Sequence, residues 1–240
     1  MAVVTSLETL LEVQARDTTI DQLAHRRATL PERAQLTAID ARLADLDSRL
    51  ADLGQQRSEV VARQEGHEGD LQASEKRIAD IERRMYSGEV SATRDLMAMT
   101  DEVESLRKRC SGLEDVALEA IEEREQLEAL IAGADEQRSV IVAERDQVQA
   151  SLEKSEGEID AEATVERSAR EQHASGLPAE LVAEYEQLRQ RLDGVGAARL
   201  VGQSCTGCHL TLPATEIDRI KRLDPAVVVY CDQCGRILIR

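Results

Sequence analysis

Four cysteines near the carboxyl end of the chain are the residues best suited to chemistry. Cys205 and Cys208 form one Cys-x-x-Cys pair, and Cys231 and Cys234 form a second. Zinc takes four tetrahedral ligands, and thiolate sulfurs bind it at about 2.3 Å. A two-residue spacer lets one tight turn present both sulfurs of a pair to the same ion. The pattern predicts one structural Zn²⁺ held by all four cysteines, which leaves no open position for a substrate or a catalytic water.

Other cysteine chemistry is the competing interpretation. A redox dithiol needs only one Cys-x-x-Cys pair, at the junction of a strand and a helix, whereas two pairs with a glycine after Cys234 favour a metal. His209 directly follows Cys208 and could replace one ligand, although four sulfurs already satisfy zinc. Cys110 occupies an apolar heptad position and is expected to be a small core residue.

The composition argues against an ordinary globular core. The 240 residues include no Trp, no Phe and three Tyr, and the net charge is −17. Aromatic side chains normally supply the largest apolar areas of a packed interior, so this chain is better suited to long, narrow helical pairs. The negative charge disfavours a general affinity for nucleic acid or anionic membranes.

Other features of the sequence indicate the cellular compartment of the protein. Residues 1–6 lack the basic region and apolar run of a secretory signal, and no segment approaches the roughly 18 apolar residues of a membrane span. We therefore expect a cytoplasmic protein without a membrane partner. Cytosolic reducing conditions favour metal ligation over disulfides for the paired cysteines.

Two heptad seams organise the helical part. Apolar residues recur in alternating steps of three and four over residues 36–85 and again over residues 96–159. Gly88 and a Ser/Thr cluster interrupt helix between them, so residues 86–95 are predicted to be the turn of an antiparallel coiled-coil hairpin. Matching the seams about this turn places Arg57 near Arg124.

Shorter elements flank the hairpin. Thr29 and Glu32 fit a capping box that restarts a helix after a separate or kinked helix over residues 5–28. Downstream, an amphipathic helix is expected to end near Asp193. Strands are predicted at 199–203, 227–230 and 236–239, with a helix at 214–223. The predicted organisation is therefore a helical hairpin part over 1–176, a short helix and linker over 177–198, and a β-rich C4 zinc ribbon over 199–240.

Three stretches resemble one bacterial family, the coiled-coil hairpin proteins that end in a C4-type zinc ribbon. They are the turn motif at 85–90, Leu-Pro-Ala-Glu-Leu at 177–181 with Tyr185, and Cys-Asp-Gln-Cys-Gly-Arg-Ile-Leu at 231–238. The family pattern usually closes with an aromatic residue, where this chain has Ile239. The resemblance implies a non-enzymatic adaptor, since members are associated with transcription factors, transcripts, or secretion and flagellar systems.

Two surfaces are candidates for partner binding. A tyrosine exposed at the end of a long hairpin has little else to pack against, and basic residues of a zinc ribbon can contact phosphates. A plain helical connector and a solvated basic face are the alternatives. The candidates are Tyr86, Glu89 and Arg94 at the turn, and Arg219, Lys221, Arg222 and Arg236 in the ribbon.

The sequence thus predicts a mainly α protein, with a long antiparallel coiled-coil hairpin and a small C-terminal zinc ribbon. No nucleophile with its base, phosphate loop or open metal site is recognisable, so we expect neither an enzyme nor a small-molecule substrate. The favoured function is an adaptor or scaffold that binds protein partners. The alternative is a transcription or RNA regulator whose ribbon contacts nucleic acid or RNA polymerase.

Overall fold

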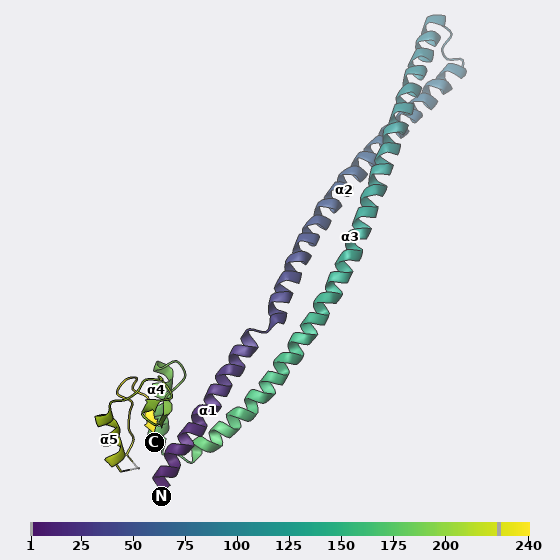
Figure 1. Ribbon diagram of the computed structural model, residues 1–240. Coiled ribbons are helices and arrows are strands. Elements are labelled where there is room, and N and C mark those ends of the chain that lie inside the picture. Colours follow the sequence, from purple (N-terminus) through teal and green to yellow (C-terminus); the bar gives the residue numbers. More distant parts are fainter. Residues whose placement is uncertain (1, 225–226) are drawn as a thin grey trace. The chain divides into compact units, whose positions relative to one another are not determined.

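The computed structural model describes residues 2–224 and 227–240, with side chains from residue 7 onward. Its elements, labelled in Figure 1, are α1 (Ala2–Ala28), α2 (Pro31–Tyr86), α3 (Thr93–Ser175), α4 (Ala179–Arg191), β1 (Ala197–Val201), β2 (Ser204–Cys205), α5 (Ala214–Arg222) and β3 (Ile237–Ile239). The mainly α fold is confirmed, since 79% of the described residues are helical. No helix in these described stretches has the length and apolar character that crossing a membrane requires.

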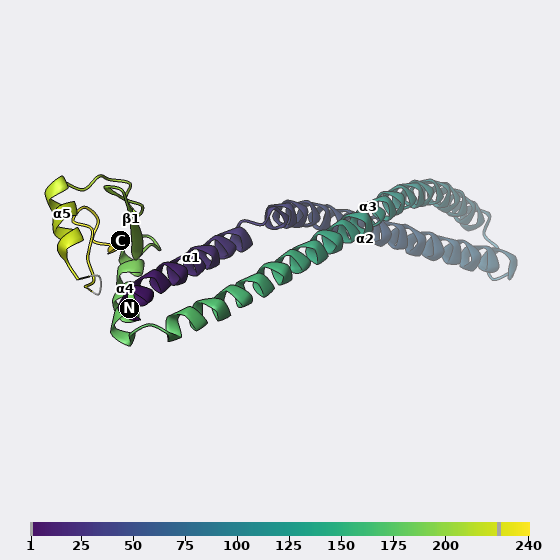
Figure 2. The same ribbon diagram turned by 60° about the horizontal axis from the view of Figure 1, so that its bottom comes forward.

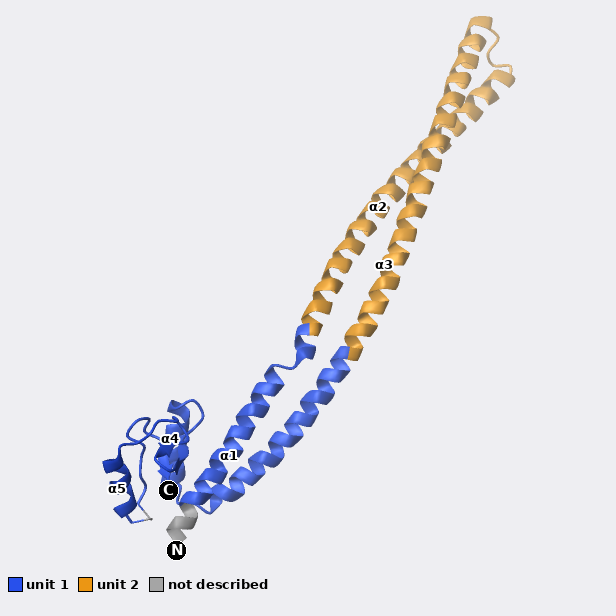
Figure 3. Ribbon diagram, viewed as in Figure 1, with its two compact units in different colours: residues 1–34, 148–240 blue, residues 35–147 orange. Residues whose placement is uncertain are grey.

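The chain divides into two compact units, which Figure 3 colours separately. The hairpin unit comprises residues 35–147 and contains most of α2 and the first part of α3. The ribbon unit comprises residues 1–34 and 148–240. It joins α1 and the last part of α3 to α4 and the zinc ribbon.

The predicted seam is confirmed in the hairpin unit. The buried residues of α2 are spaced by seven positions, or by fourteen where the intervening His67 is only partly buried: Ile39, Leu46, Leu53, Val60, Ser74 and Ile81. Leu53 and Val60 pack against Ala120 and Leu127 of α3. Cys110 is also buried, at 8% exposure, as expected of a core position. Ion pairs flank the seam, for example Arg138 with Asp47 at 2.7 Å.

The predicted approach of Arg57 on α2 to Arg124 on α3 is confirmed. Arg57 pairs with Glu128 at 3.8 Å, and Arg124 reaches the same carboxylate at 3.7 Å from four residues earlier on α3. Arg124 also donates to Gln64 at 3.1 Å. Glu128 therefore neutralises both arginines, and matching apolar positions alone could not locate this shared carboxylate.

The predicted capping box between α1 and α2 is wrong. The Thr29 hydroxyl donates back to the His25 carbonyl of α1 at 2.9 Å. The Glu32 carboxylate instead accepts from Ser151 and Ser155 of α3, at 3.3 and 3.5 Å. Glu32 faces α3 rather than the start of its own helix. Its carboxylate therefore accepts from serines of α3 and not from the backbone amide that a capping box would supply.

The strands of the ribbon form a three-stranded sheet in the order β2-β1-β3. β1 pairs antiparallel with β2 and parallel with β3, with Ala197 opposite Ile237. The predicted strand at 227–230 is not formed over its described residues, where Tyr230 makes only an isolated bridge to Ile237. The other ribbon elements lie within two residues of their predicted bounds.

The sheet has two differently packed faces because side chains alternate along a strand. On one face, Ala197, Ile237 and Ile239 belong to a core with Leu10 of α1 and Tyr185 of α4. On the other face, the neighbouring residues belong to a second core, with Cys205, Cys231 and α5. Figure 2 shows β1 next to α4. The zinc ribbon is thus folded onto the helices of its own unit through one face of its sheet.

Candidate metal centre

The four predicted ligands come together in the ribbon. Their sulfur atoms all lie within 4.8 Å of one another. The Sγ atoms of Cys205 and Cys234 are 4.0 Å apart, and those of Cys208 and Cys231 are 3.9 Å apart. A tetrahedral zinc with sulfurs at 2.3 Å requires about 3.8 Å between sulfurs. The donor set therefore fits a zinc ion in both chemistry and spacing.

Two tight turns present the sulfurs. In the first, the Gly207 amide donates to the Cys205 sulfur at 3.4 Å, and the His209 amide donates to the Cys205 carbonyl at 2.8 Å. In the second, the Gly235 amide donates to the Cys231 carbonyl at 2.7 Å, and Gly235 has φ +72°. Glycine adopts this left-handed conformation without the steric cost that other residues carry. The first turn follows β2 and the second precedes β3, so the sheet holds the two pairs face to face.

The first turn also requires glycine for space. A Cβ at Gly207 would lie 2.6 Å from Cδ of Arg236 and 2.9 Å from Cβ of Ala198. The Arg236 side chain is fixed there, because its Nε donates to the Val195 carbonyl at 2.9 Å. The backbone of the zinc turn therefore packs directly on β1 and on the side chain that follows the second cysteine pair.

The environment treats the four thiols differently. Burial raises the pKa of the Cys205 thiol and raises that of Cys231 to about 12. Burial also raises the pKa of Cys234, but hydrogen bonds from the Arg236 backbone and side chain, together with those of Cys231 and Cys208, outweigh it and lower the pKa to about 7. Zinc binding must remove the remaining thiol protons, because only thiolates bind the ion. The four cysteines then surround the dication as four negatively charged ligands.

A compact apolar core packs against the cysteines of the metal centre. Leu212, Ile217, Ile220, Val229 and Leu238 are buried with Cys205 and Cys231. Arg240 fixes the end of α5 by donating to four backbone carbonyls, those of Ile220, Leu223, Asp224 and Val227. Helix ends leave carbonyls without internal partners, and this guanidinium satisfies them.

The turn candidates lie together at the junction of α2 and α3. Tyr86 is the last residue of α2 and is 87% exposed. Glu89 and Arg94 are exposed on the loop and at the start of α3. The structure thus brings all three predicted turn residues to the same end of the hairpin unit.

The basic candidates of the ribbon differ from one another. Arg219 pairs with Glu216, with Nε 2.8 Å from Oε2. Arg236 is held by the carbonyls of Val195 and Leu192. Lys221 and Arg222 are exposed at the end of α5. Two of the four side chains are therefore engaged inside the ribbon unit.

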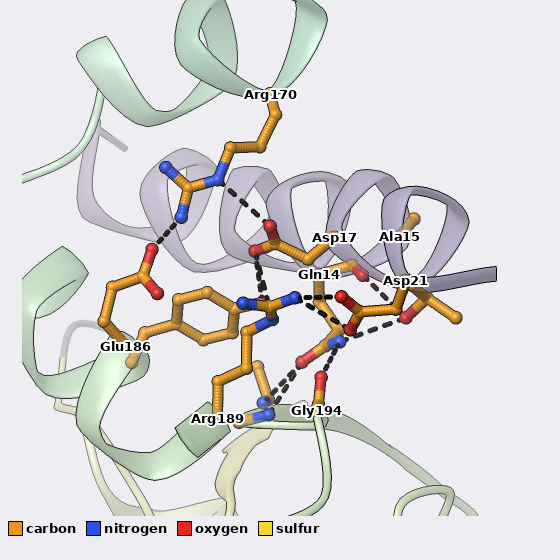
Figure 4. Close-up of polar contacts among 12 residues, drawn as sticks. Gln14, Ala15, Asp17, Asp21, Arg170, Glu186, Arg189 and Gly194 are labelled. Atoms are coloured by element: carbon orange, nitrogen blue, oxygen red, sulfur yellow. Dashed lines mark hydrogen bonds and ion pairs between the residues drawn. The ribbon is translucent and has the colours of Figure 1, made fainter. Parts of the chain in front are cut away.

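Sequence reasoning missed a buried polar network between α1, α3 and α4. Figure 4 shows Asp17 and Asp21 on α1 with the guanidinium groups of Arg170 and Arg189 directed toward them. Asp17 is 4% exposed, and Tyr185, fully buried, donates its hydroxyl to Asp17 at 2.7 Å. Burial and this hydrogen bond to Asp17 raise the pKa of Tyr185. The tyrosine therefore remains a donor across the ordinary pH range.

Gln14 extends the network to the ribbon. Its side-chain oxygen accepts from the amides of Gly196 and Ala197 at 2.7 and 3.2 Å, and its nitrogen donates to the Gly194 carbonyl at 3.0 Å. One amide side chain on α1 thereby satisfies the backbone that leads into β1. The only sequence signal for this network was Tyr185, the single aromatic residue of its helix.

Comparison with known families agrees with this geometry. Residues 13–193 match the CT398-like coiled coil hairpin domain, and residues 204–238 match the C4-type zinc ribbon domain. The chain belongs to the CT398-like coiled-coil hairpin family. The zinc ribbon match includes all four cysteines, so both the predicted resemblance and the fit to zinc are supported by the domain assignment.

Individual relatives match nearly the whole chain. Uncharacterized protein Rv2229c of Mycobacterium tuberculosis is 30% identical over 232 residues, which are 96% of this chain and 94% of the relative. A solved structure from Mycobacterium smegmatis has 26% identity and a TM-score of 0.87, covering 99% of this chain and 98% of the other. CT398 from Chlamydia trachomatis shares the fold at 21% identity and TM-score 0.74, with the same coverage. The two matched domains indicate an interaction or scaffold role.

Proposed function

We propose that this protein is a non-enzymatic, cytoplasmic adaptor that carries one structural zinc ion and connects macromolecular partners through its hairpin and its ribbon. The observation that carries the proposal is the closed cysteine site. Four thiolates fill the coordination sphere of zinc, and two of the four residues, Cys205 and Cys231, are 0% and 1% exposed. Such a metal stabilises a fold and offers no position to a reactant.

The exposed groups support binding rather than catalysis. The tyrosine at the hairpin turn is 87% exposed, and aromatic residues of this kind are common anchors of protein interfaces. The ribbon presents Val201 and Leu210, which are 58% and 51% exposed. Each unit therefore has solvent-facing apolar side chains of its own.

A regulator that binds nucleic acid is the second candidate. Lys221 and Arg222, exposed next to each other on α5, favour it. The ion pair of Arg219 and the carbonyl contacts of Arg236 weaken it, because those groups are already engaged. The remaining pair is a small basic patch for phosphate binding, on a chain of net charge −17.

An affinity experiment with the zinc-loaded full chain separates the two functions. The bait is compared with a Lys221→Glu, Arg222→Glu variant, in native lysate with and without nuclease, and both proteins and nucleic acids are identified. The adaptor predicts protein partners that survive nuclease and remain on the variant. Recovery of RNA or DNA that the variant loses would instead establish the regulator.

A further inference from the structure

The segment that joins α4 to β1, residues 192–196, turns the chain through a strained backbone. Asp193 has φ +53° and Gly194 has φ +86°. Glycine adopts such left-handed angles freely, but a residue with a Cβ, such as Asp193, carries a steric cost there. A strained conformation persists only where surrounding contacts fix it. This α4–β1 linker must therefore be held by groups outside it.

Arg236 supplies such contacts from the zinc ribbon. Its Nε donates to the Val195 carbonyl at 2.9 Å, and its Nη2 donates to the Leu192 carbonyl at 3.2 Å. These two carbonyls lie on either side of the left-handed residues. A guanidinium is planar and always charged, and its fixed fork of donors can reach two acceptors at once. One side chain thus holds both ends of the bend.

The same residue belongs to the zinc centre. Its backbone carbonyl accepts from the Cys231 amide at 2.9 Å, which closes the second zinc turn. Its side chain also lies against the first turn, because a Cβ at Gly207 would come 2.6 Å from Cδ of Arg236. Arg236 therefore contacts both zinc turns and the linker, so that a movement of either turn displaces the guanidinium from its two carbonyls.

The charge of a loaded metal centre favours this arrangement. Four thiolates outweigh the charge of one Zn²⁺, so the loaded site is negative. Hydrogen bonds from the Arg236 backbone and side chain to Cys234 place a permanent cation beside it. A positive group next to a negative centre lowers the electrostatic free energy, and more so away from bulk water. The loaded site therefore attracts the guanidinium to the position from which it binds the linker.

We propose that Arg236 is a positioning residue that couples the structural zinc to the α4–β1 linker. Zinc fixes the two turns against which the arginine lies, and the arginine fixes the linker. Because coupling between two sites is reciprocal, the linker contacts also raise the affinity for zinc. This coupling rests on the structural zinc of the proposed function and extends the effect of the ion beyond the ribbon.

The experiment measures the zinc affinity of the purified full chain by equilibrium competition with a chromophoric chelator. Arg236→Met keeps an unbranched stem beside Gly207 and removes the charge and the donors, whereas Arg236→Lys keeps the charge without the fork. Arg240→Met is the matched control. Arg240 also donates to backbone carbonyls of the ribbon unit, but these belong to residues 220–227 and not to the linker.

Arg236→Met is expected to lower the zinc affinity by about 10-fold or more, the range seen when groups that support metal ligands are removed. Arg236→Lys should lower it less, and Arg240→Met much less, although Arg240 makes more hydrogen bonds to backbone carbonyls. Hydrogen exchange of peptides that contain the linker gives a second measurement. Removal of zinc should speed linker exchange in the unchanged protein and in Arg240→Met. In Arg236→Met the linker should already exchange faster with zinc bound, so that removal adds little.

Unchanged zinc affinity of Arg236→Met would overturn the inference. An equal loss in Arg240→Met would do so too, because the effect would then be a general loosening of the ribbon. A linker that responds to zinc removal as strongly in Arg236→Met as in the unchanged protein would also contradict it. If Arg236→Met does not load zinc, Arg236→Lys takes its place in both comparisons.

Metal analysis of the unchanged chain separates this coupling from the proposed function. Stoichiometric zinc together with variants of Arg236 that behave as the unchanged protein would leave the structural zinc standing and remove only the coupling. A chain that binds no stoichiometric zinc would remove both.

Discussion

Replacing Tyr185 with phenylalanine tests whether the buried network fixes α4 to α1. The change removes one hydroxyl that donates to Asp17 at 2.7 Å. Asp17 keeps Arg170 at 3.1 Å, but its Oδ2 atom is left with Arg189 at 3.8 Å. Hydrogen bonds to charged groups contribute about 1.5–3 kcal/mol. We therefore expect the local stability of α4 to fall by about 2 kcal/mol.

Tyr230→Phe is the matched control. Its hydroxyl also donates to a carboxylate of α4, that of Glu184, but Tyr230 is 39% exposed whereas Tyr185 is fully buried. Water replaces the lost hydroxyl at Glu184, so the expected loss is below about 1 kcal/mol. The two variants remove the same chemical group and differ mainly in burial.

Hydrogen exchange of the zinc-loaded full chain, followed by mass spectrometry of peptides, measures both effects locally. A loss of 2 kcal/mol corresponds to about 30-fold faster exchange of α4 amides in Tyr185→Phe. Amides of the hairpin unit should exchange as in the unchanged protein. Equal acceleration by both variants would refute the reasoning, because the cost would then not depend on burial of the charge.

Four further substitutions have expected outcomes. Gly66→Ala and Gly112→Ala should each stabilise the hairpin unit by about 1 kcal/mol, seen as a higher melting temperature, since a Cβ at either position meets nothing within 4 Å. Cys205→Ser should abolish stoichiometric zinc in metal analysis and unfold the ribbon, while circular dichroism retains the signal of the long helices. Gly196→Ala should speed exchange of α4 more than 10-fold, because its Cβ would lie 2.7 Å from the Tyr185 carbonyl oxygen; unchanged exchange would show that the backbone yields without cost.

The hairpin and the cysteine site could be predicted because their signals are local or strictly periodic. A seven-residue repeat identifies the buried face of a helix even when the partner helix is not known. The repeat in α2 accordingly buries Ile39, Leu46 and Leu53. Each Cys-x-x-Cys pair fits one turn by itself. The meeting of the two pairs also depends on parallel pairing of β1 with β3, to which the cysteine spacing gives no direct clue.

The parts that could not be predicted depend on distant partners. The heptad pattern places Arg57 near Arg124, but it cannot show that both guanidinium groups share the carboxylate of Glu128. Asp17 resembles any surface aspartate of a helix, yet it is buried against Tyr185. Composition gives no sign of such burial, because the compensating groups lie far away in the chain.

The two faces of the ribbon sheet link the metal centre to the packing of the ribbon on the helices. Ala198 and Leu238 face the cysteine core, while their neighbours Ala197 and Ile237 face α1 and α4. A shift of β1 or β3 that follows loss of zinc must therefore disturb both cores, because a strand cannot move one face without the other. Gln14 also binds the backbone entering β1, so α1 stabilises the same strand from the helical side. The ion then contributes to how firmly the ribbon is held on the helices of its unit.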